Sequence, residues 1–168
     1  MRWLRRVLFS VSLAFLMSGE GRAQDEGVVP GSQAPIVTVP DLEGRAVDFG
    51  RFIGKQPVLL EFWATWCSIC EDLLPRMRAA KAKYGERVTF IGVNVAVNQT
   101  RERVRRYAAQ HQLPFLVVYD EEGVSTRAFE APQTSYIVIV GTDGKVAYTG
   151  VGSDQKFEDA LARVTAGQ

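Results

Sequence analysis

The chain has 168 residues, of which 46% are hydrophobic, and carries a formal net charge of +1 at pH 7. This length fits a single domain, and the hydrophobic content excludes a chain that is disordered throughout. The near-neutral charge excludes the strongly basic surface that nucleic-acid binding needs, so we expect no nucleic-acid partner.

The first 23 residues differ in composition from the rest. Three arginines lie within residues 1–6, an apolar run follows over 7–17, and Gly21-Arg22-Ala23 has small residues at the −3 and −1 positions of a cleavage site. This pattern is typical of a secretory signal peptide, residues 1–23, cleaved after Ala23. The alternative is an uncleaved membrane anchor, but the run is shorter than the roughly 20 residues that a spanning helix needs.

Removal of residues 1–23 lowers the Lys and Arg count from 20 to 16 and the Asp and Glu count from 19 to 18, which leaves a net charge of −2. We therefore expect an exported chain, located in the periplasm or otherwise outside the cytoplasm. Residues 24–35 are polar and rich in Gly and Pro, which predicts a linker, and the folded domain is predicted over 36–168.

The domain alternates predicted strands and helices. Strands are predicted over 36–39, 46–49, 58–62, 88–95, 115–119, 136–140 and 145–150, and helices over 67–84, 100–110, 125–129 and 155–164. Alternation in the middle predicts parallel strands joined by helical crossovers, and the last hairpin, turned by Asp143-Gly144, predicts an antiparallel edge. The fold class is therefore α/β, with a central mixed sheet flanked by helices and an N-terminal β-hairpin.

The helix predicted over 67–84 carries apolar residues at near-helical spacing and is expected to end at Gly85. Pro75 lies inside this helix and should kink it, because proline removes a backbone hydrogen bond. Thr100 is the expected N-cap of the following helix. His111, the single histidine, ends that helix, where we expect a surface or capping role.

The two cysteines of the chain lie together in Trp66-Cys67-Ser68-Ile69-Cys70, between a predicted buried strand and a helix. In an oxidising compartment such a pair is expected to form a disulfide. A bridge between Cys67 and Cys70 closes too short a loop to stabilise a fold, so it favours a reactive centre. Half of a structural zinc site is the alternative, but such a site needs four ligands. We expect no metal and no cofactor.

The segment Glu61-Phe62-Trp63-Ala64-Thr65-Trp66-Cys67-Ser68-Ile69-Cys70, with Pro75 five residues on, resembles the active-site segment of the thioredoxin superfamily. The predicted export, the N-terminal hairpin and Gly54-Lys55-Gln56-Pro57 narrow the resemblance to the periplasmic TlpA/ResA group of disulfide oxidoreductases, over about residues 31–165. The resemblance implies a thioredoxin fold, a redox-active disulfide and a monomer.

Two features depart from the pattern of that superfamily. Ser68 and Ile69 replace the Gly-Pro pair often found between the cysteines, and Ser135 stands where the family has a cis-proline. Pro132 is the alternative occupant of that position and would require a longer strand. Because a cis bond before a residue other than proline is costly, we expect the bond between Thr134 and Ser135 to be trans.

The roles of the site residues follow from position and resemblance. Cys67 is the expected nucleophile, because a helix N-terminus favours its thiolate, and Cys70, one turn in and more buried, is the expected resolving cysteine. Glu61 interrupts an apolar strand and matches the buried acid of the family, which would exchange a proton with Cys70 directly or through a water. The alternative is an edge strand on which Glu61 faces solvent.

Other residues of the motif are expected either at the substrate or in the core. Trp63 is expected to pack in the core, and Trp66 to cover the disulfide with an apolar surface. The residues expected to contact substrate are Trp66, Ser68, Ile69, Thr134 and Ser135.

The resemblance implies a reductant of protein disulfides, of the type that serves cytochrome c maturation or respiratory oxidase assembly. Its expected partners are client protein thiols or disulfides and a membrane thiol-transfer protein that donates electrons. The alternative is a periplasmic copper-binding thiol protein, because two thiolates bind Cu(I), although relatives with this fold use a CxxxC pair and a histidine. A peroxiredoxin-like enzyme would need a Pro-x-x-x-Thr pattern, which is absent before Cys67.

Overall fold

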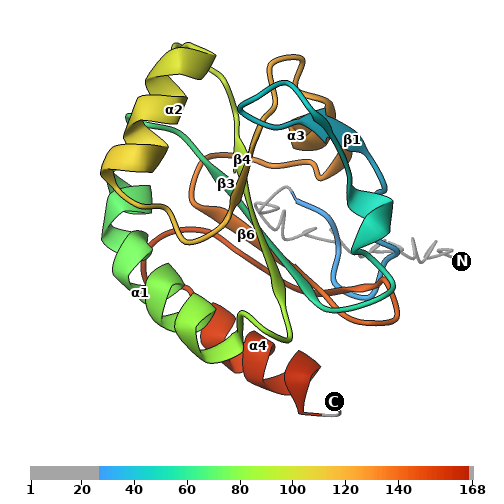
Figure 1. Ribbon diagram of the computed structural model, residues 1–168. Helices are drawn as coiled ribbons and strands as arrows, with labels where there is room; N and C mark the ends of the chain where they lie inside the picture. Colours follow the sequence, from blue (N-terminus) through green and yellow to red (C-terminus); the bar gives the residue numbers. More distant parts are fainter. Residues whose placement is uncertain (1–26, 167–168) are drawn as a thin grey trace, which may run out of the picture.

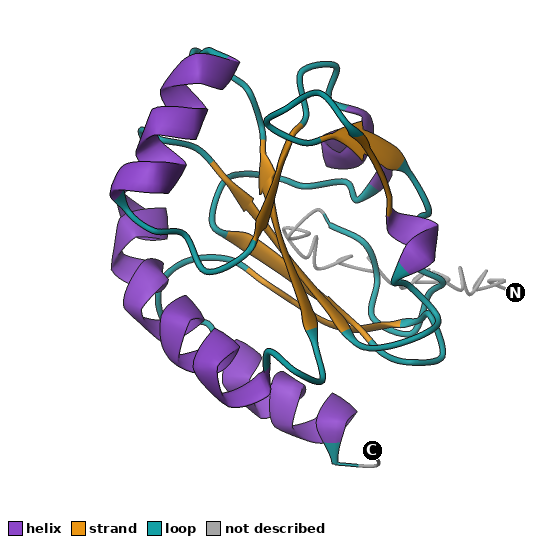
Figure 2. Ribbon diagram, in the orientation of Figure 1, coloured by secondary structure: helices purple, strands orange, loops and turns teal. Residues whose placement is uncertain are grey.

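The computed structural model describes residues 27–166 and contains a central five-stranded sheet and a separate two-stranded sheet. The central sheet has the order β5-β4-β3-β6-β7, in which β3 pairs in parallel with β4 and antiparallel with β6 (Figure 2). Its strands are β3 Val58–Trp63, β4 Thr89–Asn94, β5 Leu116–Tyr119, β6 Tyr136–Val140 and β7 Val146–Gly150. The small sheet pairs β1 Thr38–Pro40 with β2 Ala46–Asp48.

The helices lie on both faces of the central sheet (Figure 1). They are η1 Phe49–Arg51, α1 Ser68–Tyr84, α2 Arg101–Gln110, α3 Val124–Ala128 and α4 Phe157–Thr165. Helices α1, α2 and α4 cover one face, and the β1–β2 sheet, η1 and α3 cover the other. The predicted mixed α/β architecture with an N-terminal hairpin is therefore confirmed.

Successive residues of β3 point to opposite faces and enter two different cores. Leu59 packs with Leu73 and Met77 of α1 and with Phe157 of α4. Leu60 and Phe62, on the other face, pack with Phe49 and Phe129, and the Phe62 and Phe129 rings lie 5.8 Å apart. Because β3 is the central strand and is buried on both faces, its sequence reads as a continuous apolar run interrupted only by Glu61.

Helix boundaries follow the predicted signals closely. Helix α1 runs through Pro75 without interruption and ends at Gly85, whose N–H donates to the Lys81 carbonyl at 2.8 Å. Helix α2 begins after Thr100, whose Oγ1 accepts from the Arg103 N–H at 3.2 Å, so the predicted N-cap is confirmed.

The chain before β1 is joined to the domain. Gly31 N donates to the Val146 carbonyl at 2.7 Å, and Val146 N donates to the Ser32 carbonyl at 2.9 Å. Val28 and Ala34 are buried, so the part of the predicted linker that the structure describes packs against the domain. This contact gives partners to the backbone of Val146, where the edge strand β7 begins. The predicted signal peptide lies outside the described residues.

No helix within residues 27–166 combines the length and the apolar character needed to cross a membrane.

Candidate active site

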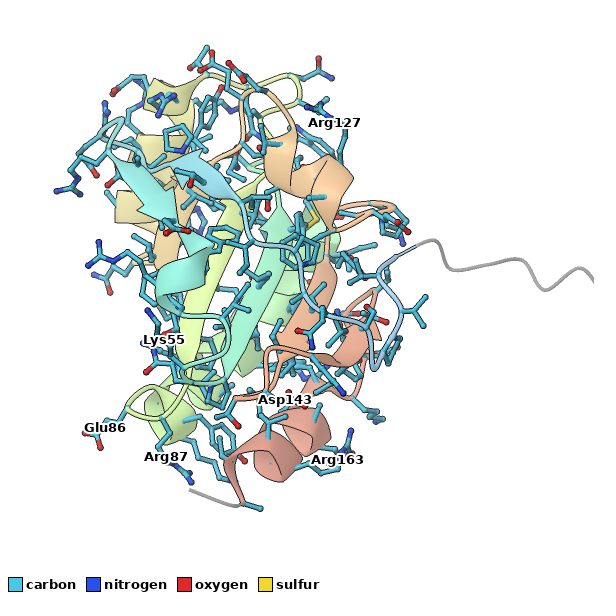
Figure 3. The ribbon with its side chains drawn as sticks, turned by 90° about the vertical axis from the view of Figure 1, so that its right-hand side faces the viewer. Lys55, Glu86, Arg87, Arg127, Asp143 and Arg163 are labelled. Atoms are coloured by element: carbon cyan, nitrogen blue, oxygen red, sulfur yellow. A yellow bond between two sulfur atoms is a disulfide. The ribbon has the colours of Figure 1, made fainter. Side chains whose placement is uncertain are left out.

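Cys67 and Cys70 form a disulfide where β3 leads into α1, with their Cα atoms 5.3 Å apart. Cys67 is the N-cap of α1, and its Sγ accepts a hydrogen bond from the Cys70 N–H at 3.1 Å. In Figure 3 the disulfide is the yellow bond in the upper half of the molecule, whereas Glu86, Asp143 and Arg163 lie in the lower half. The helix N-terminus therefore places an N–H donor on the sulfur of Cys67, where it would also stabilise a thiolate.

The two cysteines are similarly buried, which corrects the prediction that Cys70 would be the more buried one. Cys67 is 5% exposed and Cys70 is 7% exposed. Both pack in a cluster with the side chains of Leu42, Trp63 and Val104. The hairpin loop and α2 reach the site from elsewhere in the chain, and the local spacing of the cysteines gives no sign of this cover.

The segment before the cysteines is held by the loop after β4. Gln99 Oε1 accepts from the Thr65 N–H at 3.0 Å, and the Trp66 indole N–H donates to the Val97 carbonyl at 2.8 Å. Sequence reasoning did not single out Gln99, because nothing in the pattern of the 95–100 loop indicates which segment it contacts.

Glu61 is 3% exposed on the central strand, so the prediction of a buried acid is confirmed and the edge-strand alternative is wrong. Its register partners are Gly92 on β4 and Ile137 on β6, neither of which carries a charge. Among residues 27–166 no group donates a hydrogen bond to its carboxyl, and burial raises the pKa of Glu61 to about 8. At neutral pH the carboxyl therefore carries a proton when the disulfide is formed.

A small cavity joins Glu61 to the disulfide. It has a volume of about 10 Å³, is lined by Glu61, Trp63, Cys70 and Tyr107 together with three apolar side chains, and provides about the space that one water molecule requires. Trp63 is 3% exposed, as expected for a core residue, but its indole N–H is buried in this wall without a partner. The cavity therefore holds a proton donor, a titratable acid and a sulfur around one water-sized space.

Tyr107 of α2 lines this cavity and was not predicted as a site residue. Its hydroxyl donates to Glu71 Oε1 at 3.2 Å, and its ring packs on Trp63 with the centroids 5.6 Å apart. Burial, with a smaller contribution from the charge of Glu71, raises the pKa of Tyr107 to about 12. His111 stacks on the same ring at 3.9 Å and is the C-cap of α2, in agreement with its predicted capping position.

An apolar surface lies beside the disulfide. Trp66 is 48% exposed, Ile69 is 46% exposed and Val97 is 54% exposed, and Ser68 is also exposed. A cavity of about 220 Å³ opens here and is lined by Trp66, Val95, Val97, Thr126, Ala131, Pro132, Gln133 and Thr134. Residues far apart in the sequence therefore form one hollow next to the residue that precedes Cys67.

Thr134 and Ser135 differ in their accessibility. Thr134 lines the cavity, whereas Ser135 is 1% exposed and its Oγ accepts from the Gly152 N–H at 3.2 Å. The side chain of Ser135 is therefore turned away from the surface on which a substrate contact was predicted. The bond between Thr134 and Ser135 is trans, as expected, because residues 27–166 contain no cis peptide bond. Pro132 lines the cavity wall three residues earlier.

The residues that the structure describes contain no group of three or more His, Cys, Asp and Glu side chains placed to hold a metal ion.

Known proteins are similar to this chain in sequence over most of its length. The Redoxin family matches residues 29–164. The thiol-disulfide oxidoreductase ResA of Bacillus anthracis is 31% identical over 172 residues, with 95% of this chain and 97% of that protein covered. The ResA protein of Bacillus cereus (strain ATCC 10987) is 29% identical over 170 residues, with the same coverage of both chains.

Solved structures agree on the fold. A secreted Mycobacterium tuberculosis disulfide oxidoreductase homologous to E. coli DsbE has a TM-score of 0.65 and 23% identity, covering 77% of this chain and 95% of that one. A thiol:disulfide interchange protein of the thioredoxin family from Chlorobium tepidum TLS has a TM-score of 0.66 and 20% identity, covering 82% and 97%. The chain belongs to the Redoxin family and is a thiol-disulfide oxidoreductase of the TlpA/ResA type within the thioredoxin superfamily.

Proposed function

We propose that this protein is an exported reductant of protein disulfides that works through the Cys67–Cys70 couple. The observation that carries the proposal is the shared cavity in which the protonated carboxyl of Glu61 lies next to Cys70, behind a disulfide at a helix N-terminus. Such an arrangement supplies a stabilised thiolate and, beside Cys70, a titratable acid that gives up its proton or takes one up according to the redox state of the cysteines.

The reaction begins with the reduced protein. The Cys67 thiolate attacks one sulfur of a client disulfide, forms a mixed disulfide and releases the other client sulfur as a thiolate. Cys70 then loses its proton and attacks Cys67 Sγ, which releases the second client thiolate and leaves the Cys67–Cys70 disulfide. The client gains two electrons and this protein loses them.

Glu61 is the group that takes up the proton lost by Cys70. The carboxylate accepts that proton as Cys70 becomes a nucleophile, directly or through one water in the cavity. The oxidised protein is then left with a protonated Glu61, which agrees with the raised pKa of this group while the disulfide is present. When a donor dithiol reduces the disulfide again, the same proton returns to the departing Cys70 sulfur.

Client polypeptides would contact the exposed surface around the disulfide. Trp66 and Ile69 present apolar area there, Ser68 lies between the cysteines, and Thr134 lines the adjoining cavity. An extended client segment placed along 132–134 would bring its sulfur to Cys67 while an apolar side chain enters the hollow.

Export, client and electron donor are part of the same proposal. The residue pattern of a cleaved signal peptide supports export, and a relative in structure is described as secreted. We propose a monomer that acts in cytochrome c maturation or respiratory oxidase assembly and receives electrons from a membrane thiol-transfer protein. Similarity to ResA proteins supports this assignment.

The decisive test is the reduction potential of the Cys67–Cys70 couple, equilibrated against glutathione. A potential near that of thioredoxin, about −270 mV, supports a reductant, and one near about −120 mV contradicts it. The purified chain should also catalyse reduction of insulin by a dithiol.

A trapping experiment identifies the client. The Cys70→Ser variant, expressed in the source cell, should accumulate mixed disulfides through Cys67 that mass spectrometry can identify. Cys67→Ser is the matched control and should accumulate none. Absence of adducts from a Cys70→Ser variant whose Cys67 still reacts with alkylating reagents would refute the exchange mechanism.

A further inference from the structure

Ser135 has a backbone conformation that residues with a β-carbon rarely adopt. Its φ is +62°, in the left-handed region that favours glycine. Such a conformation persists only where surrounding contacts hold it in place. The contacts of Ser135 therefore identify the residues that fix the segment leading into β6.

Gln155, in the loop between β7 and α4, makes the main contact with the Ser135 backbone. Its Nε2 donates to the Ser135 carbonyl at 2.9 Å and to the Gly152 carbonyl at 2.7 Å. Gln155 is 8% exposed, and both hydrogens of its amide are used. The Gly152 N–H in turn donates to Ser135 Oγ at 3.2 Å, so the loop binds Ser135 through two groups.

Arg76 of helix α1 forms hydrogen bonds with the same loop and with the start of α4. Its Nε and Nη2 bind the two carboxylate oxygens of Glu158 at 2.7 Å and 2.6 Å. Its Nη2 also donates to the Gln155 carbonyl at 2.5 Å, and Nη1 donates to the Ser153 carbonyl. Since Cys67 is the N-cap of α1, this loop connects the helix that carries the disulfide with Ser135.

The fixed segment forms a wall of the cavity beside the disulfide. Thr134 lines that cavity together with Trp66. Thr134 immediately precedes Ser135, and Trp66 immediately precedes Cys67. The backbone conformation of Ser135 therefore determines where Thr134 lies relative to the reactive sulfur.

We infer that Gln155 is a positioning residue for exchange with polypeptides. By holding Ser135 in place, it keeps Thr134, across the cavity, at the distance from Trp66 that a client segment requires. Gln155 does not touch the sulfurs and takes no part in the electron transfer itself. The inference rests on the proposed function, because it concerns how that site holds a polypeptide.

The test compares a polypeptide substrate with a small one. Gln155→Leu keeps the approximate volume of the side chain and removes both donors. In the chain lacking residues 1–23, this variant should lower kcat/KM for insulin reduction roughly tenfold or more, mainly by raising KM, because misplacement of a binding wall weakens productive docking. The rate with a small symmetrical disulfide and the reduction potential should match those of the unsubstituted protein.

Tyr148→Phe is the matched control, because it removes the hydroxyl that contacts Gln155 Oε1 at 3.5 Å and leaves both Nε2 bonds in place. It should behave as the unsubstituted protein with both substrates. Thermal unfolding checks that the Leu variant is folded, and Gln155→Met provides a second variant without donors, with the same expected division between substrates.

Two results would overturn the inference: equal losses with insulin and with the small disulfide, or no loss with either. If the unsubstituted protein fails to reduce insulin, the proposed function itself is refuted. That failure is distinguishable, because it appears before any substitution at Gln155.

Discussion

Glu61 is a carboxyl held in an apolar strand without a charged partner, and this sets how the protein should respond to pH. Burial raises its pKa from 4.5 to about 8. In the unfolded chain the carboxyl is hydrated and loses its proton near its ordinary pKa. Over the interval between these two values the unfolded state is ionised and the folded state is not, so stability must fall as pH rises.

The first prediction follows from this decrease of stability with rising pH. For the oxidised protein, the free energy of unfolding should be highest relative to Glu61→Gln below pH 4.5 and should decrease toward pH 8. Glu61→Gln lacks this ionisation, so its stability relative to that of the unsubstituted protein should rise by on the order of 4 kcal/mol between pH 5 and pH 8.5, at about 1.4 kcal/mol for each pKa unit. Urea unfolding at pH 5 and pH 8.5 measures the difference, and equal pH dependence of the two proteins would contradict a raised pKa.

The second prediction concerns the rate at which a dithiol reduces the disulfide. In the proposed mechanism, protonated Glu61 supplies the proton that the departing Cys70 sulfur takes up. The rate constant, corrected for the ionisation of the dithiol, should therefore fall as pH rises through about 8. Glu61→Gln should be slower by on the order of 10²-fold and independent of pH over this range. Stopped-flow tryptophan fluorescence follows the reaction. A pH profile of Glu61→Gln that still falls near pH 8 would assign the proton to another group.

The type and position of each residue explain which parts of the site could be predicted from the sequence. Cys67 and Cys70 are adjacent in the chain, and Glu61 stands out because a carboxylate interrupts an apolar strand. Gln99 and Gln155 reach the site by hydrogen bonds to segments 34 and 20 residues away, at Thr65 and Ser135. Their polarity is ordinary for loops, so only the folded structure reveals these contacts.

At the scale of elements, helix α2 provides cover for both cysteines through Val104 and Tyr107. Its start is fixed by Thr100, whose Oγ1 satisfies the otherwise unpaired Arg103 N–H. An N-cap of this kind contributes about 1 kcal/mol. The position of α2, and with it the burial of the disulfide, depends on this local signal.

The third prediction follows from that cap. Thr100→Ala should lower the free energy of unfolding by about 1 kcal/mol. It should also increase the rate at which reagents reach the cysteines, because fraying of the first turn of α2 exposes Cys67 and Cys70. Thr142→Ala, at an exposed turn position, is the control and should change neither quantity. Guanidinium unfolding and disulfide reduction rates measure the two effects, and an unchanged Thr100→Ala protein would show that packing alone fixes α2.

Element types were predictable for a physical reason. Continuous apolar runs gave β3, β4 and β6, and apolar spacing gave α1 within one residue of its observed start. The contact of residues 28–34 with β7 was not predictable. Pro30 and Gly31 interrupt that segment, and its strand-like pairing depends on backbone groups rather than on a side-chain pattern.

For the whole molecule, the segment before β1 pairs with the start of the edge strand β7 and the two residues before it. Gly31, Ser32 and Ala34 exchange backbone hydrogen bonds with residues 144–146, and Gln33 forms an isolated bridge with Lys145. Val28 and Ala34 contribute to the core that also contains Phe49 and Phe129. The segment therefore contributes burial and also protects an edge that would otherwise be open to another chain.

The fourth prediction separates these two contributions. A chain that begins at Ile36 should be less stable than one that begins at Gly27 by on the order of 2 kcal/mol, because Val28 and Ala34 no longer bury apolar area. It should also self-associate at high concentration, since the backbone of residues 144–146 loses its partners. Urea unfolding and light scattering measure these effects.

In the chain beginning at Gly27, Val28→Ala should lower stability without association, because its backbone pairing remains. If the shorter chain is equally stable and monomeric, the contact of residues 28–34 with the domain does not stabilise the fold.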